Sequence, residues 1–124
     1  MTGTTGSTVV IPKSTAHQTI TCMGALVQAY RQDPPAGAAQ AVGELTEDSR
    51  TLVARMQASG DATVRVPVAT LSRIADQLTR GAQAETGSEA LQSALWRTAG
   101  RLQRWIAHAS AEAAPARAAG ASHR

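Results

Sequence analysis

The chain has 124 residues, which is enough for one domain or two very small ones. Its single cysteine, Cys22, excludes an internal disulfide framework, and no apolar run is long enough to cross a bilayer. The formal charge is +3, and all of the excess lies in residues 61–124, where eight arginines stand against five acidic residues. Such a basic half is compatible with a nucleic-acid partner, although an arginine-rich genome would also produce it.

Aromatic residues are scarce, with no Phe, one Tyr and two Trp. The core must therefore consist of Val, Leu, Ile, Met and Ala, and alanine favours helices that approach one another closely. A core this thin would gain stability from dimerisation, so we expect a homodimer. The N-terminal sequence lacks the charged and apolar regions of a secretory signal, and we expect a cytoplasmic protein of a bacterium or a phage.

The first half of the chain predicts a strand followed by two helices. Residues 1–7 are Thr, Gly and Ser after the first Met and predict a flexible arm. Residues 8–11 form a short β-type run that ends at a proline. A helix over about 15–32, capped by Thr15, follows and ends at two successive prolines. A second helix over about 36–59 has apolar residues spaced alternately by four and three, as in a coiled coil.

The second half repeats this order. Residues 63–66 alternate polar and apolar side chains, which predicts a strand with one buried face. An amphipathic helix over about 67–80 follows, and the last helix starts after a cap at Thr86 and runs to about Ser110. The alanine-rich residues 111–124 predict a disordered tail. The fold class is thus mostly α, with two short strands and four helices in a single compact domain over 8–110.

The two halves form an internal repeat. A shift of 55 residues places TVVIPKST at 8–15 on TVRVPVAT at 63–70, and both copies continue into two helices. The halves would then be 8–59 and 62–110, each a strand–helix–helix unit, although two unrelated strand-to-helix junctions could match by chance. The strand at 63–66 pairs either with residues 8–11 of the same chain or with its own copy in a partner subunit.

Residues 62–108 resemble the ribbon-helix-helix family, the DNA-binding fold of small bacterial and phage repressors and of plasmid accessory proteins. The resemblance is carried by the strand TVRVP at 63–67, by the following helix core and by the junction GSEAL at 87–91; the helix core residues are Leu71, Ile74 and Leu78. It implies that two strands pair into an antiparallel ribbon that enters the major groove of double-stranded DNA.

By position, this resemblance implies that Thr63 and Arg65 face bases and that Gly87 and Ser88 hold a phosphate at the start of the last helix. If residues 8–58 are a second unit, Thr8 and Val10 would be its outward strand residues.

Four further side chains on the last helix are candidate contacts. Arg97, Arg101 and Arg104 are spaced by four and three, so they share a face opposite the apolar stripe. That face would bind phosphate or an acidic partner, or it would simply be solvated. Trp96 lies about 110° from the centre of the stripe and indicates a protein contact if it is exposed. A bundle that buries two sides of the helix would explain Trp96 equally well.

The sequence offers no arrangement typical of an enzyme. Cys22 and the three histidines are too scattered for a metal site, and no phosphate-cradling glycine loop occurs. The acidic residues Glu44, Glu47 and Asp48 lie on a polar helix face with arginines nearby, and we expect them to be solubilising charge. We therefore expect no catalytic residue, no metal and no cofactor.

The sequence favours a small DNA-binding protein, namely a transcriptional repressor or a plasmid or phage accessory factor that places a β-ribbon in the major groove. A non-enzymatic helical adaptor or inhibitor that binds a partner protein is the alternative, with Trp96 and the arginine face as its contact surface. A purely structural oligomer built on the four-three seams is a third possibility. None of the three involves a membrane.

Overall fold

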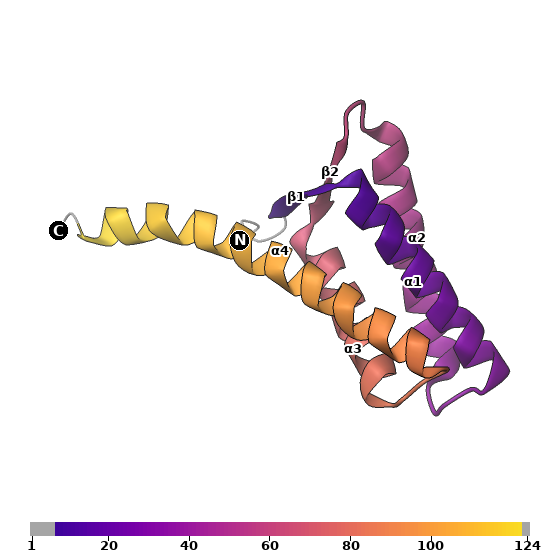
Figure 1. Cartoon of the computed structure of the whole chain (residues 1–124). Helices are drawn as coiled ribbons and strands as arrows, with labels where there is room; N and C mark the ends of the chain where they lie inside the picture. The colour runs from indigo at the N-terminus through magenta and orange to yellow at the C-terminus, as the bar shows by residue number, and fades with distance from the viewer. Residues whose placement is uncertain (1–6, 123–124) are drawn as a thin grey trace.

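The computed structural model describes the backbone of residues 7–122 and the side chains of residues 7–109. Over that range the chain is mostly helical, with four helices and one two-stranded sheet (Figure 1). The elements in order are β1 (Thr8–Pro12), α1 (Lys13–Gln32), α2 (Ala38–Ala58), β2 (Thr63–Pro67), α3 (Val68–Gln83) and α4 (Glu89–Ser122). This confirms the predicted fold class and element order. No helix in the described residues combines the length and the apolar character needed to span a membrane.

The two strands pair with each other in an antiparallel ribbon within one chain, with Val10 opposite Arg65. Backbone hydrogen bonds extend the ribbon beyond both ends, from the Lys13 N–H to the Ala62 oxygen at 2.8 Å and from the Val68 N–H to the Ser7 oxygen at 3.1 Å. The choice left open by the sequence is thereby settled, because each strand finds its partner in the same chain. A partner subunit is not needed to build the ribbon, and the expected homodimer stays a prediction.

Equivalent residues of the repeat meet each other in space. Val10 and Arg65 are related by the 55-residue shift and also face each other across the ribbon. Leu26 and Gly81 are related by the same shift, and a Cβ built on Gly81 would stand 2.8 Å from Leu26 Cδ1. Two such self-equivalent contacts are what an approximate two-fold axis through the ribbon and the core produces. The two halves are thus arranged about an approximate two-fold axis, and a duplication of the chain stays a prediction.

The core lies between the inner face of the ribbon and the four helices. The strand residues that point inward are buried, and so is the stripe of α3 that the sequence predicted; these residues are Val9, Ile11, Val64, Val66, Leu71, Ile74 and Leu78. Met23 and Leu26 of α1, Leu45 and Leu52 of α2 and Leu95 and Leu102 of α4 are fully buried as well. An interior of aliphatic side chains agrees with the near absence of aromatic residues.

Two predicted helix starts are wrong. Helix α1 begins at Lys13, and its N-terminus has no side-chain cap. The Lys13 N–H is already bonded to the ribbon, so the helix continues directly from β1 and Thr15 is buried inside its first turn. Helix α4 is capped by Ser88, whose Oγ accepts a hydrogen bond from the Leu91 N–H at 3.1 Å, and not by Thr86. A serine at this position satisfies one of the free N–H groups of the first turn.

Two predicted helix ends also differ from the structure. Helix α3 runs through Gly81 to Gln83, so this glycine does not end the helix. Gly81 lies where α3 crosses α1, and the absence of a side chain leaves room for Leu26. Helix α4 continues to Ser122, past the predicted end near Ser110 and through most of the segment 111–124 that was expected to be disordered. Alanine has the highest intrinsic helix propensity, which favours this extension. Residues 123 and 124, and residues 1–6 of the predicted arm, lie outside the described residues.

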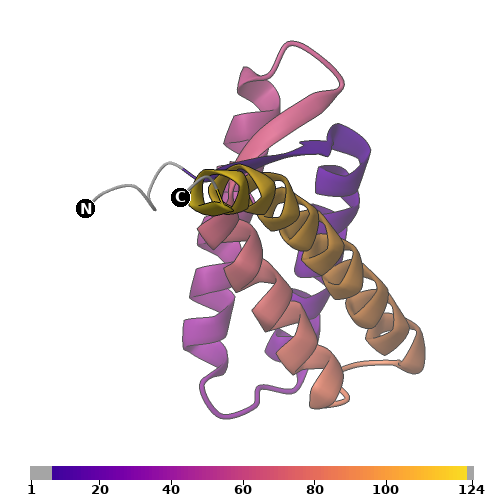
Figure 2. The same cartoon turned by 90° about the vertical axis from the view of Figure 1, so that its left-hand side faces the viewer.

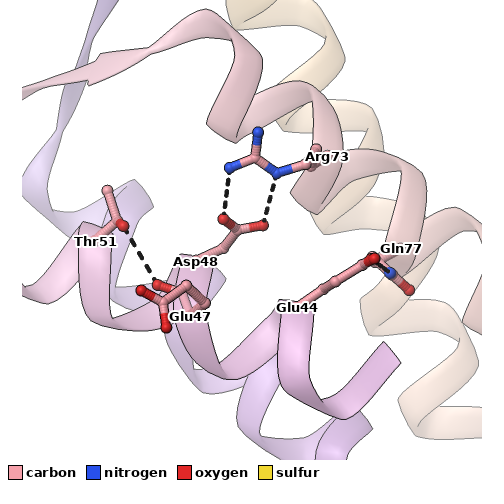
Figure 3. A network of polar contacts seen from close by, with 6 residues as sticks. All are labelled: Glu44, Glu47, Asp48, Thr51, Arg73 and Gln77. Atoms are coloured by element: carbon pink, nitrogen blue, oxygen red, sulfur yellow. Dashed lines mark hydrogen bonds and ion pairs between the residues drawn. The ribbon is translucent and has the colours of Figure 1, made fainter. Parts of the chain in front are cut away.

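A polar contact between α2 and α3 was not predicted from the sequence (Figure 3). Asp48 is only 3% exposed, so its assignment as solubilising surface charge is wrong. Its carboxylate accepts two hydrogen bonds from Arg73, at 2.8 Å from Nη2 and 3.4 Å from Nε. These bonds raise the pKa of Arg73 further above its usual value. One turn away, the side-chain amide of Gln77 donates to Glu44, so two side-chain pairs hold α2 against α3.

Gly81→Ala should destabilise the protein by about 1–3 kcal/mol, because the new methyl group overpacks the α1–α3 crossing. Both branches of Leu26 lie close to the built Cβ, at 2.8 and 3.2 Å, and Leu95 stands at 3.3 Å. Gly43→Ala is the matched control, since nothing lies within 4 Å of its Cβ position in α2. It should stabilise the helix by about 0.5–1 kcal/mol. Urea unfolding followed by circular dichroism measures both, and equal stabilities would contradict the close crossing.

Arg73→Ala should destabilise the protein by about 1–3 kcal/mol, because it leaves the Asp48 carboxylate buried without its charged partner. The side chain of Arg73 is itself 55% exposed, so the loss stays below that of a fully buried pair. Arg80→Ala is the control, since Arg80 pairs with Asp76 on the surface of α3. It should cost about 0.5 kcal/mol or less in the same urea titration. If the two variants are equally stable, Asp48 does not depend on Arg73.

Candidate nucleic-acid interface

The outward face of the ribbon lies at one end of the helical body (Figure 1). Inward and outward residues alternate along both strands, so Thr63 and Arg65 are exposed on β2 and Val10 is 39% exposed on β1. This is the face on which the sequence placed Thr63 and Arg65. The Nη1 of Arg65 donates a hydrogen bond to Thr8 Oγ1 at 3.2 Å, so its guanidinium lies across the ribbon over β1. A diagonal contact of this kind is common between neighbouring antiparallel strands.

A second guanidinium lies beside the ribbon and was missed in the sequence. Arg55, in the last turn of α2, donates from Nη1 to the backbone oxygen of Arg65 at 3.4 Å. Among the described residues, no ion pair is formed by Arg55 or by Arg65. The two side chains line one shallow hollow on the ribbon; its other residues are Val10, Ala58, Ser59, Asp61 and Thr63. No sequence pattern indicated Arg55, because only the turn after α2 brings it to β2.

One carboxylate lies in the same hollow. Asp61 accepts a hydrogen bond from the Ser59 hydroxyl at 3.2 Å, from the Thr63 N–H at 3.4 Å and from the Thr63 hydroxyl at 3.3 Å. These bonds, the one from Ser59 above all, lower the pKa of Asp61, so it is charged at neutral pH. The hydroxyl hydrogen of Thr63 is thereby engaged within the turn. Arg65 is therefore the stronger hydrogen-bond donor of the two predicted base-contacting residues.

The outer edge of β2 is closed by side chains. Ser59 Oγ lies against the Thr63 oxygen and shares its single hydroxyl hydrogen between that oxygen and Asp61, and Arg55 donates to the Arg65 oxygen. Lys13 Nζ in turn donates to the Ser59 oxygen at 2.9 Å, which ties the end of α2 to the start of α1. A carbonyl that already accepts a side-chain hydrogen bond is less accessible to the N–H of another strand. The ribbon is therefore better suited to present side chains from its face than to add a strand at this edge.

The structure does not bring Gly87 and Ser88 to the ribbon. The α1–α2 loop and the α3–α4 loop lie together at the opposite end of the body (Figures 1 and 2), where they line one shared hollow. The 16 residues of α3 separate that end from β2 by about 24 Å. Asp33 and Glu85 also line this hollow, and their charge opposes a phosphate there. A duplex on the ribbon face would therefore not meet Gly87 or Ser88 in the way the resemblance implies.

The three arginines of α4 have different surroundings. Arg97 and Arg104 are exposed, whereas Arg101 is half-buried and donates to Gln18 Oε1 of α1. Arg101 therefore helps to join α4 to α1, and only Arg97 and Arg104 remain as outward cations. The middle of α4 also contacts β1, so this helix lies next to the ribbon (Figure 1).

Trp96 and Cys22 differ in their exposure to solvent. Trp96 is 50% exposed on α4, so a bundle that buries two sides of the helix does not explain it. Cys22 of α1 is buried against α4, and this burial raises its pKa. The described residues contain no cluster of three or more His, Cys, Asp or Glu side chains that could hold a metal ion.

Comparison of this chain with protein-family models, with curated proteins and with solved structures finds no match. The resemblance of residues 62–108 to the ribbon-helix-helix family therefore stays a prediction. The candidate interface accordingly depends on the geometry of the ribbon and of the charged side chains around it.

Proposed function

We propose that this protein binds double-stranded DNA through the outward face of the β1–β2 ribbon, as a repressor or a plasmid or phage accessory factor does. The observation that carries this proposal is the position of Arg65. It lies at the centre of an exposed two-stranded ribbon, with a second guanidinium beside it and with no ion pair among the described residues. The major groove of B-DNA is wide enough to admit a two-stranded ribbon.

The two guanidinium groups suit different contacts. Arg65 projects from the ribbon face, where its planar fork can bind the O6 and N7 atoms of guanine in place of its contact with Thr8. Arg55 comes from the end of α2 at the edge of the ribbon, which suits a backbone phosphate. The carboxylate of Asp61 repels phosphate on the turn side of the hollow, so the phosphate would lie on the side of Arg55.

Arg65→Ala should weaken binding to a selected DNA site by about 1–3 kcal/mol and relax base preference there, because one bidentate base contact is lost. Binding is measured by fluorescence anisotropy, first with random-sequence duplex from low to physiological salt and then with the selected site. Arg31→Ala is the control of equal charge, since Arg31 is exposed in the last turn of α1, away from the ribbon. Wild-type protein that fails to bind duplex at low salt, or an Arg65→Ala variant that binds as wild type does, would refute the proposal.

Arg55→Ala should weaken binding to all duplexes to a similar extent and reduce the slope of log K against log salt by about 1. A phosphate contact carries no sequence information, so the selected base preference should stay unchanged. The same anisotropy titrations at four salt concentrations measure the slope. An unchanged slope would place Arg55 outside the interface.

Trp96 favours a second candidate function, a helical adaptor or inhibitor that binds a partner protein. A half-exposed tryptophan on a helix is the kind of side chain that anchors protein interfaces. This function predicts no duplex binding and a partner whose retention is lost with Trp96→Ala but kept with Gln103→Ala, an exposed residue of the same helix. Affinity chromatography with the three proteins tests it, and equal retention by all of them would exclude Trp96 as the anchor.

A further inference from the structure

We propose that the ribbon reads a non-palindromic DNA sequence as a single chain, with Arg65 and Val10 contacting the two halves of the site differently. This inference rests on the proposed function and specifies its target. A ribbon made by two copies of one strand presents the same residues on both sides of its axis, and its DNA site mirrors that symmetry. Here both strands belong to one chain, so the two sides of the axis are free to differ.

The outward residues of the two strands differ at one position. Under the 55-residue shift, Thr8 corresponds to Thr63 and Pro12 to Pro67, so the residues at both ends of the ribbon are the same. The central positions are Val10 on β1 and Arg65 on β2, which face each other across the approximate two-fold axis. The outward residues of the two strands therefore differ at the centre of the ribbon.

The two central side chains read different chemical groups. Arginine binds the paired acceptors O6 and N7 of guanine, whereas valine has no donor and can only make apolar contact, for which the thymine methyl group is the partner in the major groove. Val10 is 39% exposed on the same face, so its methyl groups are available for that contact. The target should thus carry a guanine on the Arg65 side and a thymine on the Val10 side.

Arg55 adds to the asymmetry. It lies on the Arg65 side of the axis, where it is bonded to the Arg65 backbone. The side of the site that carries the guanine should therefore also carry the closer phosphate contact. A single chain would bind in one preferred orientation.

The experiment selects bound sequences from a random duplex library with four full-length proteins: wild type, Val10→Arg, Arg65→Val and the double variant that exchanges the two residues. Wild type should select a non-palindromic site and bind it as one chain per duplex by sedimentation, in contrast to the homodimer that the thin core predicts. Val10→Arg should select a palindromic site with guanine in both halves. Arg65→Val should lose the guanine and bind the wild-type site roughly 5- to 150-fold more weakly.

The exchanged variant supplies the decisive comparison. The two-fold axis interchanges positions 10 and 65, so this protein should regain the wild-type sequence, bound in the opposite orientation. Both positions are outward, and circular dichroism melts confirm that each variant is folded. A palindromic wild-type site, two chains per duplex, or an exchanged variant without guanine preference would overturn this inference while leaving DNA binding intact. Absence of duplex binding by all four folded proteins at low salt would instead overturn the proposed function, and this inference with it.

Discussion

The pairing of β1 with β2 is the contact on which the rest of the structure depends. It joins residues far apart in the chain, and its hydrogen bonds run from Ser7–Val68 to Lys13–Ala62. An isolated two-stranded ribbon is marginal in water, so this one is stable only because its inner valines and isoleucine pack on the helices. In return the ribbon sets where α1 and α3 begin, since each helix follows its strand without a loop.

A single chain with two similar halves can do at its approximate two-fold axis what a homodimer cannot. In a homodimer, a residue on the axis meets its own copy, so two leucines would collide and two glycines would leave a cavity. Here Leu26 fills the space that Gly81 leaves open. The ribbon shows the same principle, because two arginines at its centre would repel each other, whereas Val10 lies opposite Arg65 without that cost. The approximate symmetry thus describes how the two halves are arranged. Where the halves differ, Leu26 packs closely against Gly81 and a single arginine lies at the centre of the outward ribbon face.

Polar contacts fix α2 relative to the ribbon and to α3. At its C-terminal end, Arg55 and Ser59 donate to the carbonyls of β2, which closes the strand edge and positions a cation beside Arg65. Along its middle, the Asp48 carboxylate is held by Arg73 of α3 (Figure 3). The candidate interface therefore depends on side chains that lie outside the ribbon itself.

The sequence by itself determined the elements and their faces, because these depend on local spacing. The alternation at 63–66 predicted that Arg65 points outward, and the three- and four-residue spacing of Leu71, Ile74 and Leu78 predicted the buried stripe of α3. Only the tertiary structure decided that the strands pair within one chain, that Gly81 lies in a helix crossing, and that Gly87 and Ser88 are remote from the ribbon. The tertiary structure likewise decided that Asp48 is buried and that Arg55 lies beside the ribbon. Each of these depends on contacts between segments that are distant in the sequence, and no local sequence pattern indicates such contacts.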